Sequence, residues 1–153
     1  MAMDWACARL AAMQPLVLYE ALALRSSVFV VEQVCVYLDP DGFDAQCWHL
    51  TDHAGDALHA YARLVPPLTK GAQQTQPMIG RVVTAPAMRG QGQGRALMLQ
   101  ALAECARLWP GETVEIQAQA HLQNFYASLG FVALSDVYDE DGISHIDMKR
   151  VAP

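Results

Sequence analysis

The sequence has little charge and few basic residues. Only 17% of its 153 residues are charged and 53% are apolar, a composition typical of a compact globular domain. Ten basic residues stand against 16 acidic ones, a net charge of −6. Because phosphate contact needs clustered Lys and Arg, nucleic acid is not an expected partner. The acidic surface suits a cationic small substrate or is simply a soluble surface. We expect residues 1–153 to form a single domain.

Long hydrophobic runs are also missing. The longest apolar region, residues 16–31, is interrupted by Glu20 and Arg25, so we expect no membrane span and no membrane partner. The N-terminus lacks a basic region followed by a hydrophobic block, which predicts that there is no signal peptide. These absences favour a cytoplasmic protein.

The cysteines and histidines lack the spacing of a disulfide framework or a metal site. Neither CxxC nor a similar motif joins Cys7, Cys35, Cys47 and Cys105, which favours reduced, mostly buried thiols. The histidines at 49, 53, 59, 121 and 145 form only loose pairs, so we expect no bound metal.

Hydrophobic periodicity predicts alternating helices and strands. Residues 14–29 read as a helix that opens near Pro15, with an apolar stripe at Tyr19, Leu22, Ala23, Ser26 and Val30. The runs at 47–52 and 57–65 predict a hairpin, in which Trp48 and Tyr61 belong to the core. Residues 78–84 form the clearest strand, and an amphipathic helix covers 97–108.

The C-terminal third continues the alternation. We expect a strand at 113–118, a short helix at 122–130 closed by Gly130, and strands at 131–134 and 144–150, the last two joined by a turn at 139–142. A further strand is expected around residues 4–7. The order predicts a mixed α/β (α+β) sheet with hairpins at both ends and one βαβ crossover.

Three glycines follow the clearest strand, at positions 90, 92 and 94 of "AMRGQGQGRALM". A strand, a glycine loop and a helix together turn backbone N–H groups and the positive end of the helix toward an anion. The Walker A spacing GxxxxGK[ST] fails because Arg95 stands in the sixth position from Gly90. The dinucleotide spacing GxGxxG requires glycine in its sixth position. It fails because this position is Arg95 when counted from Gly90 and Leu97 when counted from Gly92.

The segment Arg89–Gly94 does match [Q/R]xxGxG/A, which resembles the acetyl-CoA loop of the GNAT superfamily of N-acyltransferases. "LQNFYASLGF", residues 122–131, is similar to the short helix and following strand of that superfamily. "RSSVFVVEQVCVYLDPDGFD", "AYARL", "IGRVV" and "VYDEDGISHIDM" extend the resemblance to the ElaA-type branch over nearly the whole chain. The resemblance implies a mostly antiparallel sheet of six to seven strands, splayed in the middle, with about four helices.

The resemblance also implies the residues that contact acetyl-CoA. The pyrophosphate would lie on the amides after the central strand, the pantetheine arm would pair with that strand, and a side chain after the next strand would contact the arm. Gln119 stands where many relatives carry an Asn, and Asn124 is the alternative. The implied contacts are Val82, Val83, Thr84, Arg89, Gly90, Gln91, Gly92, Gln93, Gly94, Arg95, Gln119 and Asn124.

Tyr126 matches the tyrosine that acts as general acid in many GNAT enzymes, because a phenol carries its proton at neutral pH. The other reading of Tyr126 is a core aromatic beside Phe125. For the general base, Glu32 is the first candidate, since it interrupts an apolar run; His121 and Glu115 are alternatives, and several relatives use a water chain.

The acceptor pocket implied by the resemblance lies between the first helix and two acidic loops. Their carboxylates either attract an ammonium group or only favour turns; they are Asp39, Asp41, Asp44, Asp139, Glu140 and Asp141. The implied reaction moves an acetyl group from acetyl-CoA directly to a primary amine of a small molecule or peptide. A longer acyl donor and a non-catalytic acyl-CoA sensor are the alternatives. Homodimers occur in the family, so self-association is one option.

Overall fold

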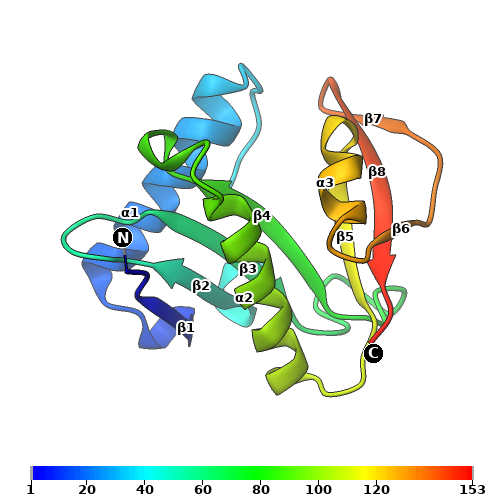
Figure 1. Ribbon diagram of the computed structural model, residues 1–153, viewed down its shortest axis with the longest axis horizontal. Coiled ribbons are helices and arrows are strands. Elements are labelled where there is room, and N and C mark those ends of the chain that lie inside the picture. Colours follow the sequence, from blue (N-terminus) through cyan, green and yellow to red (C-terminus); the bar gives the residue numbers. More distant parts are fainter. Residues whose placement is uncertain (1, 153) are drawn as a thin grey trace.

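The fold is built on one open sheet of eight strands, and a computed structural model describes it for residues 2–152. The strand order is β1-β2-β3-β4-β5-β8-β6, with β7 paired to β8 (Figure 1). The strands are β1 (Trp5–Arg9), β2 (Trp48–Asp52), β3 (Ala60–Val65), β4 (Met78–Thr84), β5 (Val114–Gln119), β6 (Val132–Ala133), β7 (Tyr138–Glu140) and β8 (Ile143–Arg150). All pairs are antiparallel except β4 with β5.

Three α-helices are present in this part of the chain: α1 (Pro15–Arg25), α2 (Gln93–Leu108) and α3 (Gln123–Ala127). α1 continues as the π-helix η2 (Ser26–Glu32). Short 3-10 turns are η1 (Leu10–Ala12), η3 (Asp44–Gln46), η4 (Pro86–Met88) and η5 (Ala120–Leu122). None of the described helices is long and apolar enough to cross a membrane.

Helices cover both faces of the sheet. Leu97, Met98 and Ala101 of α2 pack with Ala62 and Leu64 of β3. On the other face Ala21 and Val28 contact Tyr61 and Val83. The alternation of strand side chains explains the division, because neighbouring residues of β3 point to opposite faces.

The predicted face of the central helix is confirmed: Leu97, Met98, Ala101, Leu102 and Cys105 are buried. The stripe predicted for the first helix is wrong. Tyr19 is 72% exposed, and the residues that α1 and η2 bury are Ala21, Arg25 and Val28. An ion-paired arginine faces inward, and the wider π-helical turn after Arg25 changes the spacing that a regular helix would keep.

The hairpin at the C-terminal end has one strand more than expected. Residues 139–142 were expected to be a turn, but Tyr138–Glu140 pairs with β8 as β7. The turn shortens to Asp141 and Gly142, whose φ values of 53° and 81° are those that a tight two-residue hairpin turn requires.

Candidate functional site

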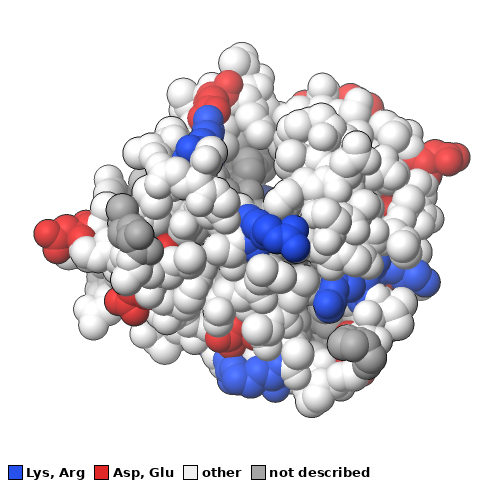
Figure 2. Space-filling view, viewed as in Figure 1, with Lys and Arg blue, Asp and Glu red and all other residues white. Residues whose placement is uncertain are grey.

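A cavity separates the two halves of the sheet where β4 and β5 diverge. These parallel strands are paired only at Met78 with Glu115 and at Ile79 with Ile116. Beyond that point they separate, as the resemblance implied, and Figure 1 shows the two halves opening away from the paired ends. The cavity of about 770 Å³ lies in this gap, and Figure 2 shows the surface hollowed between the two halves.

A bulge in β4 accompanies the divergence. The register between β3 and β4 shifts between Tyr61 and Arg63, and Arg81, opposite this shift, has a φ of 51°. A non-glycine residue in the left-handed region costs free energy and persists only where the surroundings hold it. Asp39 holds Arg81 in place, because Asp39 Oδ1 accepts a hydrogen bond from Arg81 Nε at 2.8 Å. The ion pair therefore fixes the backbone at one wall of the cavity.

The glycine loop delivers the first turn of α2 to the open end of this cavity. Gly90 and Gly92 have φ values of 77° and 74°, so glycine is needed there to avoid strain. No side chain caps α2, whose N-cap residue is Gly92, and its first N–H groups remain available to an anion. Gly94 lines the cavity. Gln93 turns inward instead, and its side-chain amide donates to Asp52 Oδ2 at 2.6 Å.

The two arginines that flank the loop have protein partners. Arg89 donates to both carboxylate oxygens of Glu32, at 2.6 and 2.8 Å. These hydrogen bonds hold the pKa of the Glu32 carboxyl below its ordinary value, which weakens Glu32 as a proton acceptor. Arg95 is exposed and donates to Ser128 Oγ at 3.3 Å.

Tyr126 lies at the cavity wall with its ring in the core. It is 6% exposed and contacts the edges of Phe125 and Phe131, with ring centroids 5.1 and 5.9 Å away. Burial raises the pKa of the Tyr126 hydroxyl to about 12. Within residues 2–152 no hydrogen bond engages this hydroxyl, so its proton is free for a group in the cavity. The packing and general-acid interpretations are therefore compatible.

Residues 32–35 form a short strap across the mouth of the cavity. Glu32 pairs with Arg89 after β4, as described above. Gln33 accepts a hydrogen bond from Gln119 Nε2 of β5 at 3.3 Å. Cys35 Sγ donates to the carbonyl of Asp141 in the β7–β8 turn at 3.4 Å. The strap thus touches both halves of the sheet.

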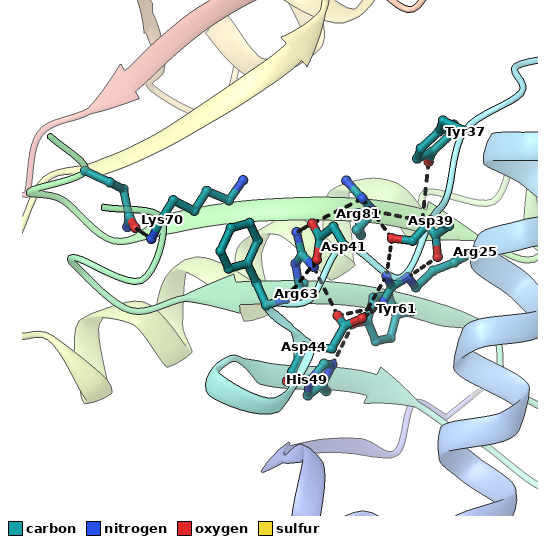
Figure 3. Close-up of polar contacts among 12 residues, drawn as sticks. Arg25, Tyr37, Asp39, Asp41, Asp44, His49, Tyr61, Arg63, Lys70 and Arg81 are labelled. Atoms are coloured by element: carbon teal, nitrogen blue, oxygen red, sulfur yellow. Dashed lines mark hydrogen bonds and ion pairs between the residues drawn. The ribbon is translucent and has the colours of Figure 1, made fainter. Parts of the chain in front are cut away.

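The first acidic loop does not present free carboxylates. Asp39, Asp41 and Asp44 pair with arginines from three elements, Arg25 of α1, Arg63 of β3 and Arg81 of β4 (Figure 3). Burial alone would raise the pKa of Asp44, but hydrogen bonds from Arg25 and then Arg63 outweigh it and keep the pKa below its ordinary value. Of the two interpretations of this loop, attraction of an ammonium group is not favoured for these three carboxylates, because three positive charges already balance them.

Tyr61 and His49 extend this network under the sheet. The Tyr61 hydroxyl lies 2.6 Å from His49 Nδ1 and accepts from Arg25 Nη1 at 3.4 Å. Burial lowers the pKa of His49, so the neutral ring is favoured. Tyr61 is completely buried and Trp48 packs partly buried against the core, as the sequence predicted.

The remaining candidates divide between the cavity and the surface. Val82, Val83, Thr84, Gln119 and His121 line the cavity, as do Glu140 and Asp141 of the second acidic loop. Asn124, Glu115 and Asp139 are not among the lining residues. Asn124 is exposed on α3, whereas Gln119 lines the cavity, so the geometry favours Gln119 of the two alternatives. Among the described residues no three His, Cys, Asp or Glu side chains gather in a way that could hold a metal ion.

Sequence reasoning missed the basic side chains of the site. Arg25, Arg63 and Arg81 stand alone in apolar stretches. An arginine in such a position needs a buried anion, and the aspartates of 39–44 were the available ones. Lys70, in the loop between β3 and β4, also lines the cavity and was not considered.

Comparison with known proteins identifies the family. The family model for the acetyltransferase (GNAT) domain matches residues 53–152. The protein ElaA of Escherichia coli is 46% identical over 136 residues, which cover 87% of this chain and 86% of ElaA. A UPF0039 protein of Synechocystis is 44% identical over 155 residues, or 100% of this chain and 99% of that protein.

Solved structures agree with the sequence comparison. The crystal structure of an acyl-CoA N-acyltransferase from Pseudomonas aeruginosa is 45% identical, with a TM-score of 0.91 over 98% of this chain and 100% of that chain. The chain therefore belongs to the GNAT acetyltransferase family and is an acyltransferase. Within the family it is of the ElaA type, and the crystal structure of Escherichia coli ElaA superposes with a TM-score of 0.88.

Proposed function

We propose that this single-domain acyltransferase moves an acetyl group from acetyl-CoA directly to a primary amine. The observation that carries the proposal is the uncapped start of α2, presented by Gly90 and Gly92 at the open end of the β4–β5 gap. Helix N-termini of this kind bind phosphate groups through backbone N–H donors and the helix dipole. The pyrophosphate of the co-substrate fits this position, with Gln91 and Gln93 contributing main-chain groups.

The gap also suits the pantetheine arm. Val82, Val83 and Thr84 border the cavity where β4 has lost its partner β5. Unpaired main-chain groups at such an edge can pair with an extended ligand as they would with another strand. Gln119, on the opposite wall, supplies a side-chain amide that is already oriented by Gln33.

In the proposed reaction the amine nitrogen attacks the thioester carbonyl, the new C–N bond forms and the C–S bond breaks. Tyr126 gives its proton to the departing sulfur, and the amine loses a proton to water or to a residue at the cavity. Burial favours the neutral phenol, which keeps the donor protonated throughout the physiological pH range. We do not assign the base to Glu32, because its carboxylate is held by Arg89.

Calorimetry and a thiol-release assay test the proposal together. Acetyl-CoA is expected to bind with measurable heat, and at least one primary amine in a broad panel is expected to release free CoA. Binding of acetyl-CoA without turnover on any amine would favour the sensor, and faster turnover with octanoyl-CoA than with acetyl-CoA would favour the longer-chain alternative. Four free cysteines are consistent with the cytoplasmic location that we propose for this reaction.

A further inference from the structure

The end of the cavity at the paired ends of β4 and β5 has a surplus of positive charge. Three arginines and three aspartates of the buried network neutralise one another. Lys70 adds one more cation beside them. Within the part of the chain that the structure describes, its ammonium group makes neither an ion pair nor a hydrogen bond; its neighbour is the ring of Phe43, with Nζ 5.9 Å from the centroid. Figure 3 shows Lys70 extending toward Arg63 and Asp41.

Asp41, the carboxylate whose charge acts on Lys70, already has hydrogen-bond donors of its own. Asp41 accepts from both Nη atoms of Arg63 at 2.8 Å, from the Phe43 backbone N–H at 3.1 Å and from Arg81 Nη2 at 3.4 Å. Some N–H donors of the basic side chains, by contrast, have no hydrogen-bond acceptor among residues 2–152. The Nε of Arg63, a side chain that is 1% exposed, has no hydrogen-bond partner. Lys70 therefore offers N–H groups without acceptors to the cavity, and the buried Arg63 keeps one N–H that no acceptor in the described chain satisfies.

The surroundings of Lys70 favour an incoming anion. Burial and the neighbouring Arg63 lower the pKa of Lys70, which means that its positive charge is destabilised where it stands. An anion bound beside it would relieve that cost. Lys70 is partly surrounded by the protein, but its residue surface is exposed and it lines the cavity, so a ligand can reach it.

We propose that Lys70 binds an anionic group, a carboxylate or a phosphate, on the acceptor amine. This inference rests on the proposed function and narrows its substrate class to amines that carry a negative charge at the far end. The register between β3 and β4 gives the length of the cavity wall that such an acceptor would span. Arg63 lies opposite Gly80, and Tyr61 lies opposite Val83, three residues further along β4, or about 10 Å at the rise of a strand. An acceptor amine that reacts beside Val83 would therefore be separated by several bonds from an anion bound at the Arg63 end of the cavity.

Matched acceptors test the site. The probes are 4-aminobutanoate, its uncharged amide 4-aminobutanamide, and 3-aminopropyl phosphate, each assayed with acetyl-CoA by thiol release. The wild-type protein is expected to have a kcat/KM at least about 10-fold higher for an anionic acceptor than for the amide, the factor that a charged hydrogen bond typically provides. Comparison of kcat/KM for 4-aminobutanoate with kcat/KM for 3-aminopropyl phosphate identifies which anion is preferred.

In Lys70→Gln the ratio of kcat/KM for the acid to kcat/KM for the amide is expected to fall close to one, mainly because KM for the acid rises. Lys70→Arg is expected to retain most of the preference for the acid. Rescue by arginine is not expected if Lys70 accepted a proton, because arginine does not titrate in this range. Affinity for acetyl-CoA, measured by calorimetry, is expected to be unchanged in both variants. Lys149 is the matched control, since it lies on β8 outside the cavity; Lys149→Gln should leave the ratio as it is.

The outcomes separate this inference from the proposed function. Turnover with equal kcat/KM for the acid and the amide, or a ratio that survives Lys70→Gln, would overturn the Lys70 site while the acetyltransferase activity stands. Absence of turnover on every amine would count against the proposed function. In that case calorimetry of the acid and the amide with the CoA-loaded protein decides the site alone, because selective binding of the acid that is lost in Lys70→Gln supports it and equal binding contradicts it.

Discussion

Asp39 accepts a hydrogen bond from Arg81 in the middle of the sheet, at 2.8 Å, and this contact connects the first acidic loop to the wall of the cavity. The same carboxylate receives Arg25 Nε through its other oxygen at 2.8 Å. Arg81 carries the left-handed backbone of the β4 bulge. A loop far away in the sequence therefore holds the strand that opens the gap.

Removing the negative charge of Asp39 should destabilise the protein. In Asp39→Asn the buried Arg25 loses a charged partner, and breaking such a pair costs about 3 kcal/mol of unfolding free energy. Urea denaturation measures this loss. An exposed pair provides the control: Arg107→Gln, which removes the contact with Glu104 on the surface of α2, is expected to have little effect. Equal midpoints for the two variants would contradict a supporting role for Asp39.

Tyr126→Phe should reduce turnover without weakening co-substrate binding. Loss of a positioned proton donor typically lowers kcat by about 100-fold or more, whereas the phenyl ring keeps its contacts with Phe125 and Phe131. Thiol-release kinetics and calorimetry with acetyl-CoA measure the two effects. Tyr138→Phe is the control, because the Tyr138 hydroxyl bonds Asp147 outside the cavity. Undiminished turnover in Tyr126→Phe would leave Tyr126 as a core residue only.

Gly90→Ala should weaken acetyl-CoA binding by about 10-fold. An alanine has room at this position, but the left-handed backbone costs it about 1–2 kcal/mol, so the loop is expected to leave the conformation that presents its amides. Gly55→Ala is a matched control, since Gly55 has a φ of 71° in the β2–β3 hairpin and lies outside the cavity. Both variants should lose similar thermal stability, and only the first should lose affinity in calorimetry.

Glu32→Gln separates two roles for this side chain. The ion pair with Arg89 predicts that kcat changes little, because a carboxylate with a lowered pKa that is held by an arginine is a poor base. Release of Arg89 should leave acetyl-CoA affinity equal or higher, as measured by calorimetry at low ionic strength. A large fall in kcat with normal binding would restore Glu32 as the proton acceptor.

The stability of the network should decrease in acid. The pKa of Asp44 in the folded protein is below its ordinary value, near 3.9 in the unfolded chain. Its contribution is therefore complete above about pH 5 and is lost as the pH falls toward the folded pKa. The free energy of unfolding should therefore decrease progressively below about pH 5. Urea titrations of wild type and Asp44→Asn are expected to converge as the pH falls from about 5 to 3, and a constant difference would contradict the linkage.

Much of the fold could be read from local sequence. Met78–Thr84 was predicted as a strand at the bounds observed, because its β-branched residues favour an extended chain. The face of α2 followed from a regular helical period. The first helix could not be read in this way, since the inward residue Arg25 looks like a surface residue until its partners at 39 and 44 are known.

The sequence by itself determined that a glycine loop follows a strand and opens a helix, since backbone freedom and helix capping are local properties of residues 89–97. Only the tertiary structure decided which charges are free. Asp39, Asp41 and Asp44 are neutralised by arginines that are distant in the chain, whereas Lys70 has no such partner among the described residues. Electrostatic pairing depends on distance in space, and no pattern along the chain specifies that distance.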